Sequence, residues 1–77
     1  MNKKYVYRGQ DITLDVYEKI KATVELLAEK ENLPFEDAYL KFATSPVYEA
    51  LQNTETVLWY ESPQYLVDEY YRKTTQN

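Results

Sequence analysis

Carboxylates are the side chains of this chain that are best suited to acid–base or metal chemistry. The sequence contains no His and no Cys, which removes imidazole bases, thiol nucleophiles and the usual zinc ligand sets. Two adjacent acidic pairs, Glu36-Asp37 and Asp68-Glu69, remain. Catalysis by such a pair needs a cleft and perturbed pKa values, and a solvated helix face supplies neither. We therefore predict no enzyme, metal site or cofactor, unless carboxylates bind a metal or act on a substrate held by a partner chain.

The two serines and the single glycine are explained by local structure. Ser45 and Ser62 each precede a proline, which is the pattern of a helix N-cap followed by Pro at the first helical position. With Gly9 as its only glycine, the chain cannot build a phosphate-binding loop or a dinucleotide fingerprint. The serines therefore predict two helix starts and no nucleophile.

A stripe of acids is expected along the first helix, over residues 11–31. Apolar residues recur there at helical spacing, and the acids fall on the opposite side. This acidic stripe comprises Asp11, Asp15, Glu18, Glu25 and Glu29. It can dock a basic partner or imitate phosphate spacing, but the simpler interpretation is a solvated face with an Asp15–Lys19 pair at i, i+4.

Aromatic content is the unusual feature of the composition, with nine Tyr and one Trp. Trp and Tyr give a large contact area with a polar handle, so they fill small cores and also dominate interfaces. For Trp59, Tyr70 and Tyr71 we predict the core. A surface patch of Tyr60, Tyr65 and Arg72 is the predicted partner-binding site.

These residues are expected on a mainly α fold, a small bundle of three to four helices within one domain spanning residues 1–77. Apolar periodicity, Ser-Pro starts and the Asn32-Leu33-Pro34 break predict helices over 11–31, 35–43, 47–52 and 64–73. β-Branched and aromatic residues favour a short two-stranded element that pairs 5–7 with 56–60. Residues 1–10 form an arm or a strand, and residues 74–77 are expected to fray.

Charge and hydropathy limit the partners. The formal charge of −4 argues against general affinity for nucleic acid or anionic membrane. The segment 47–52 is also a poor DNA-recognition helix, because it offers only Gln52 for base contacts and carries an acid. The absence of a signal-peptide pattern, a membrane-length apolar run and cysteine predicts a cytoplasmic protein.

A family resemblance covers roughly the chain from the first helix onward and leaves out the N-terminal ten residues. It rests on Glu36-Asp37-Ala38-Tyr39 through Ser45-x-x-Tyr48-x-x-Leu51, and on Thr56-x-Leu58-Trp59-x-x-Ser62-Pro63-x-Tyr65-Leu66. This pattern resembles a group of small helical bacterial proteins of unknown function, found mostly in Gram-positive bacteria. Some such proteins are similar to ones encoded beside larger toxin-like or mobile-element genes, which implies an accessory or partner role.

The leading hypothesis is a non-enzymatic protein–protein interaction or accessory module, the small partner of a larger toxin-like or mobile-element protein. An alternative is an acidic inhibitor or mimic that acts on a nucleic-acid-binding protein. The two differ in salt sensitivity, because a mimic's complex weakens steeply as salt rises whereas an aromatic contact tolerates it. Self-association through surplus aromatic surface is a third interpretation and predicts a homodimer.

Overall fold

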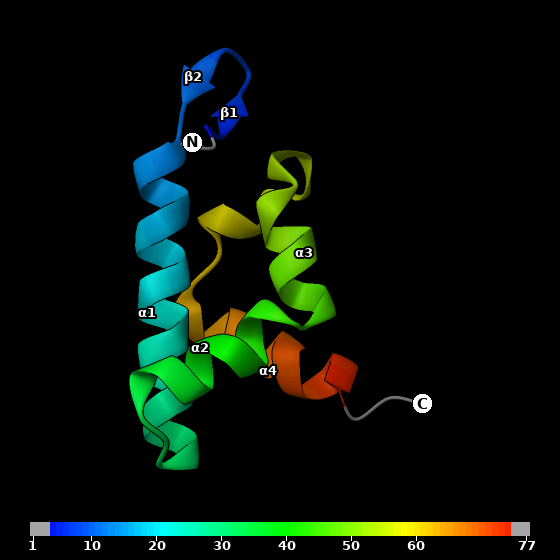
Figure 1. Ribbon diagram of the computed structural model, residues 1–77. Helices are drawn as coiled ribbons and strands as arrows, with labels where there is room; N and C mark the ends of the chain where they lie inside the picture. The colour runs from blue at the N-terminus through cyan, green and yellow to red at the C-terminus, as the bar shows by residue number, and fades with distance from the viewer. Residues whose placement is uncertain (1–3, 75–77) are drawn as a thin grey trace.

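The computed structural model describes residues 4–74, which form a helical bundle with a small hairpin at one end (Figure 1). The hairpin strands are β1 (Val6–Tyr7) and β2 (Gln10–Asp11). The helices are α1 (Thr13–Glu31), α2 (Phe35–Ala43), α3 (Pro46–Gln52) and α4 (Pro63–Thr74). Two 3-10 turns, η1 (Thr54–Thr56) and η2 (Leu58–Tyr60), connect α3 to α4. The predicted mainly α bundle is thus confirmed.

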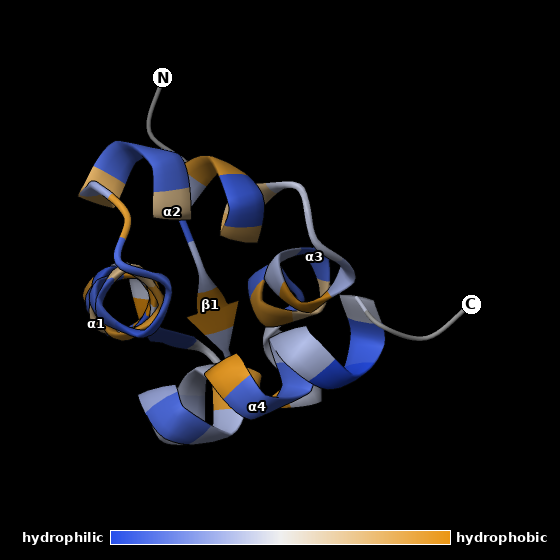
Figure 2. Ribbon diagram, turned by 90° about the horizontal axis from the view of Figure 1, so that it is seen from below, coloured by the Kyte–Doolittle hydropathy of each residue, from blue (hydrophilic) through white to orange (hydrophobic). Residues whose placement is uncertain are grey.

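The core lies where the apolar face of α1 meets the other helices. Figure 2 looks nearly along α1 and shows α2, α3 and α4 around a shared centre, toward which orange segments of α3 and α4 turn. The fully buried side chains include Val16, Val24, Leu27, Phe42, Leu51, Leu66 and Val67. Tyr70 is buried as predicted, whereas Trp59 and Tyr71 pack against the core only in part.

The two-stranded element exists, but its predicted pairing was wrong. β1 pairs antiparallel with β2, with Val6 opposite Asp11 and Tyr7 opposite Gln10. Arg8 and Gly9 make the turn, both in the left-handed region at φ 50° and 80°, which is the geometry of a tight two-residue hairpin. Residues 56–60 form 3-10 turns instead of a strand.

The hairpin still meets the segment that was predicted to pair with it, because the Tyr7 ring contacts the Trp59 ring with centroids 5.4 Å apart. A hydrogen bond from Thr54, just before that segment, adds to this contact. Thr54 Oγ1 donates a hydrogen bond to the carbonyl of Val6 at 2.8 Å. β1 pairs with β2 on one edge, and residues 56–60 fold into 3-10 turns rather than adding a strand on the other. The sequence therefore predicted proximity of these two regions but not the form of the contact.

Both Ser-Pro signals begin helices, as predicted. Ser45 Oγ accepts the Tyr48 N–H at 3.3 Å, and Pro46 is the first residue of α3. Ser62 Oγ accepts the Tyr65 N–H at 3.1 Å ahead of α4. Capping thus accounts for the position of each serine hydroxyl.

At the N-terminal end, the described chain is packed rather than loose. Tyr5 is buried, its N–H donates to Thr13 Oγ1 at 2.8 Å, and its carbonyl accepts the Ile12 N–H at 2.8 Å. At the other end α4 reaches Thr74, and the predicted fraying of residues 75–77 lies outside the described residues. None of the helices within residues 4–74 has the length and apolar character that a bilayer crossing requires.

Candidate functional site

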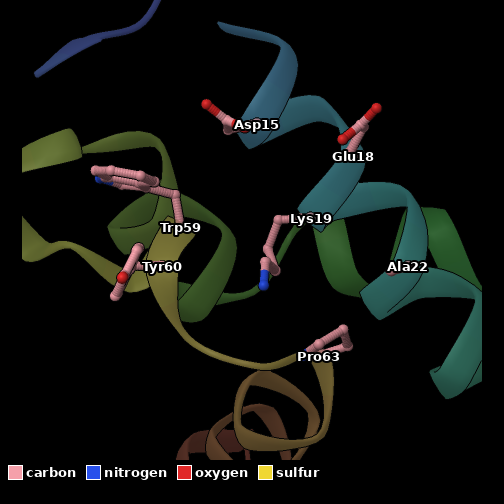
Figure 3. Close-up of a pocket in the computed structure, with 7 residues that line it drawn as sticks. All are labelled: Asp15, Glu18, Lys19, Ala22, Trp59, Tyr60 and Pro63. Carbon is pink, nitrogen blue, oxygen red and sulfur yellow. The ribbon is translucent and has the colours of Figure 1, made fainter. Parts of the chain in front are cut away.

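An open groove with a volume of about 530 Å³ lies between α1 and the segment that leads from η2 into α4 (Figure 3). Its lining consists of Asp15, Glu18, Lys19, Ala22, Trp59, Tyr60 and Pro63. The groove joins two features that the sequence indicated as separate surfaces. It places two members of the acidic stripe opposite Tyr60.

Carboxylates of α1 form one wall of the groove. Asp15, Glu18 and Ala22 lie three or four residues apart, so they share one side of the helix. In Figure 3 the Asp15 carboxylate points toward the Trp59 side, and the Glu18 carboxylate turns away from the aromatic pair. Within residues 4–74 neither carboxylate forms an ion pair. Their negative charge is available to a ligand.

Lys19 crosses the groove rather than pairing with Asp15. Its ammonium donates to the backbone carbonyl of Glu61, in the link between η2 and α4. The predicted Asp15–Lys19 pair is therefore wrong. An exposed i, i+4 pair contributes only a few tenths of a kcal/mol, so a carbonyl held in place by a turn competes with it. Lys19 thereby connects the two walls of the groove.

The opposite wall is aromatic, and Trp59 anchors it. The Trp59 indole N–H donates to the carbonyl of Thr54 at 3.0 Å, and its ring meets Tyr7 with centroids 5.4 Å apart. The Tyr60 ring contacts Trp59 at 5.7 Å in an edge geometry. Tyr60 is nevertheless 80% exposed, the largest value among the exposed large apolar side chains. A fixed Trp59 thus presents a solvent-facing Tyr60.

The backbone that places this pair is strained at Val57, which has φ 52° and ψ 22°. The left-handed region is disfavoured for L-residues by about 1–2 kcal/mol, and a β-branched residue there is an outlier. The reversal at Val57 separates η1 from η2. Thr56 Oγ1 supports it by donating to the carbonyl of Ala50 at 2.9 Å and accepting the Leu58 N–H at 3.3 Å.

Tyr65 and Arg72, the other two residues of the predicted patch, lie on the exposed face of α4. The Arg72 guanidinium is bound to Glu69, with contacts of 2.6 and 3.1 Å. That guanidinium holds the pKa of the Glu69 carboxyl below its ordinary value. Neither Tyr65 nor Arg72 lines the groove. The structure brings Tyr60 to the acidic wall and leaves the other two on α4.

The rest of the acidic stripe is not continuous with the groove. Asp11 lies in β2 and not in the first helix, because the tight hairpin delays the start of α1 to Thr13. Hydrogen bonding by the Thr13 side chain, then by the Thr13 N–H at 3.0 Å, and last the nearby Lys4 charge lower the pKa of its carboxyl. Glu25 pairs with Lys21 at 3.6 Å. Glu29 is exposed beyond the groove.

No family model, curated protein or solved structure matches this chain. The resemblance to small bacterial proteins therefore stays a prediction. Among residues 4–74 no three acidic side chains gather closely enough to hold a metal ion. The groove combines carboxylates, a fixed indole and an exposed phenol.

Proposed function

We propose that the protein is a cytoplasmic, non-enzymatic interaction module that binds a protein partner through this groove. The observation that carries the proposal is the 80% exposure of Tyr60 beside the anchored Trp59. Tyr and Trp are enriched among the few residues that dominate interface energetics. A small domain usually needs its large aromatic rings in the core. The exposed position of the Tyr60 ring therefore suggests that it belongs to a contact surface.

Preorganisation supports the same proposal. Binding loses affinity when side chains and loops must be ordered at the interface. Here Trp59 is held by Thr54 and Tyr7, and Lys19 connects α1 to the link after η2. The positions of the two aromatic residues are thus set before a partner arrives.

The partner that we propose is a larger protein, as the resemblance to small proteins encoded beside toxin-like or mobile-element genes implies. Ion pairing within the acidic stripe supports the groove over the whole stripe as the docking surface. Within the described residues Asp11 and Glu25 each have a lysine partner, and Asp15, Glu18 and Glu29 have none. Asp15 and Glu18 are the unpaired acids that line the groove.

A pull-down from the source cell's lysate at low and high salt, with mass spectrometry, tests this function. The tagged wild type is compared with Tyr60→Ala and with Tyr65→Ala, a matched control on α4. We expect one stoichiometric partner that survives high salt, is lost with Tyr60→Ala and is kept with Tyr65→Ala. Circular dichroism confirms that both variants fold.

Other outcomes would assign a different surface or function. Loss with Tyr65→Ala alone would move the site to α4. Capture only of nucleic-acid-binding proteins, and only at low salt, would support the acidic mimic instead. A concentration-dependent dimer that disappears with Tyr60→Ala would make a second copy of this chain the occupant of the groove.

A further inference from the structure

We infer that the groove binds an arginine side chain of the partner, with the guanidinium against the Tyr60 ring and hydrogen-bonded to Asp15. The inference rests on the proposed function and specifies its ligand. It also makes Asp15 and Tyr60 the residues that determine specificity, and it assigns Trp59 a positioning role.

Charge selects a cation. The groove holds the carboxylates of Asp15 and Glu18 and one ammonium, that of Lys19. Lys19 already donates to the Glu61 carbonyl, and the two carboxylates have no ion-pair partner within the described residues. The whole chain carries −4, so long-range attraction also favours a basic segment. An acidic ligand would meet the α1 wall at close range.

The aromatic wall selects a cation that can stack. A cation over the face of Tyr or Trp is attracted by the ring quadrupole. Tyr60 offers such a ring at 80% exposure, with the Trp59 edge beside it. The same chain already contains this contact, because the Arg8 guanidinium carbon lies 5.2 Å from the Tyr7 ring centroid. Tyr7 and Tyr60 both contact Trp59. An arginine on Tyr60 would therefore make with that ring the contact that Arg8 makes with Tyr7.

Geometry favours arginine over lysine. A guanidinium is planar and weakly hydrated, so it can lie on a ring while its edge donates to a carboxylate. Figure 3 shows the Asp15 side chain leaving α1 on the side of the groove where Trp59 and Tyr60 lie, with its carboxylate above the two rings in this view. A lysine ammonium is a compact charge that stays more strongly hydrated.

The test is a titration of the ¹⁵N-labelled 77-residue chain, followed by amide and Trp59 indole shifts in NMR spectra. The probe is the blocked peptide Gly-Ser-Arg-Ser-Gly, and the matched control peptide carries citrulline, which is neutral and nearly the same shape. Binding by one side chain is expected to be weak, with a Kd on the order of millimolar. The shifts should saturate and should concentrate on residues 15–22 and 59–60.

Matched variants separate the two contacts. Tyr60→Leu removes the ring quadrupole and should weaken binding of the arginine peptide about threefold, whereas Tyr60→Phe should bind the peptide as tightly as the wild type does. Asp15→Asn should weaken it about threefold by removing the ion pair, and Asp37→Asn, the same change on exposed α2, should not. The citrulline peptide should bind about tenfold more weakly than the arginine peptide, because it loses both contacts.

Two results would overturn the inference. One is equal shifts with the arginine and citrulline peptides, and the other is unchanged affinity in both Tyr60→Leu and Asp15→Asn. If either occurs while Tyr60→Ala still abolishes the pull-down, the groove binds a partner by other chemistry, and the proposed function stands without this ligand. If the pull-down also ignores Tyr60, both proposals are wrong.

Discussion

Two connections between helices each contain a residue in the left-handed backbone conformation, but only one of these residues is of a type that tolerates it. Between α1 and α2, Asn32 takes the left-handed conformation at φ 55°, which Asn tolerates better than most residues. The Leu33 N–H then donates to the Ala28 carbonyl at 2.9 Å, closing a Schellman-type helix end. Between α3 and α4, the left-handed position at φ 52° is filled by Val57, a residue that resists it.

What compensates for Val57 is a set of hydrogen bonds within the connection, to α3 and to the hairpin. Trp59 donates to Thr54, Thr56 donates to Ala50, and Thr54 donates to Val6 in the hairpin. The first connection is thus encoded by its own residues, whereas the second also depends on contacts with the hairpin, through Thr54 and Trp59. The strained connection is also the one that carries Tyr60 into the groove, which agrees with strain clustering at functional sites.

The largest expected effect comes from removing the anchor of the strained connection. Trp59→Ala deletes the ring contact with Tyr7 and the hydrogen bond to Thr54. Since the ring is only partly buried, we expect a loss of about 2 kcal/mol in the free energy of unfolding in urea. Trp59→Phe keeps a ring and should lose about 1 kcal/mol. Equal stability of all three proteins would mean that this connection does not depend on Trp59.

A slightly smaller effect is expected if the first connection is given the residue type of the second. Asn32→Val places a β-branched side chain at φ 55°, which should lower the unfolding free energy by about 1.5 kcal/mol. Asn32→Gly, which relieves the conformation, should stay within about 0.5 kcal/mol of the wild type. If Asn32→Val is as stable as Asn32→Gly in urea melts, the match between residue and backbone at this helix end contributes nothing.

Glu31, next to the first connection, gives a pH-dependent test. Its carboxylate accepts from Lys41 and from the Tyr71 hydroxyl, each at 2.8 Å. These bonds, that from Lys41 first, lower the pKa of Glu31 below its ordinary 4.5. The stabilisation is therefore present above pH 4.5 and is lost as the pH falls through the lower folded-state pKa.

Glu31→Gln should cost about 1 kcal/mol at pH 7, because a half-exposed charged hydrogen-bond network is partly screened. Below pH 4.5 the difference from the wild type should shrink. Urea unfolding at several pH values measures both quantities. Comparison with the wild type cancels the acid sensitivity of Asp11 and Glu69, whose pKa values are also lowered. Glu29→Gln, an exposed neighbour, is the control, and a gap independent of pH would contradict the assignment.

Local signals made much of the fold predictable. Ser45-Pro46 and Ser62-Pro63 begin helices, and Asn32 ends one, because each residue acts on its own backbone. Residues 56–60 were predicted to be extended because β propensity measures fit to a pleated surface. The Arg8-Gly9 turn instead pairs β1 with β2, and the left-handed Val57 breaks residues 56–60 into two turns.

The groove, like the fold, could be predicted from local sequence only in part. Its acids and Tyr60 could each be predicted as exposed from the sequence. That they face one another depends on the reversal at Val57 and on the Lys19 bond to the Glu61 carbonyl. Neither is a property of a residue and its near neighbours, and β-branching at Val57 indicates a different conformation. Local sequence preference therefore predicts the wrong backbone conformation at Val57, the residue whose reversal brings Tyr60 to the candidate site.

The smallest expected effect is a gain from resolving that conflict. Val57→Asn supplies a residue that tolerates the left-handed region, and the 37% exposure of Val57 limits the packing that is lost. We expect the unfolding free energy to rise by about 0.5 kcal/mol, measured in urea. Val57→Thr keeps the β-branch and should change little. Lower stability in Val57→Asn than in Val57→Thr would show that side-chain packing, and not backbone strain, dominates at this residue. The two connections would then differ only in the contacts that hold them.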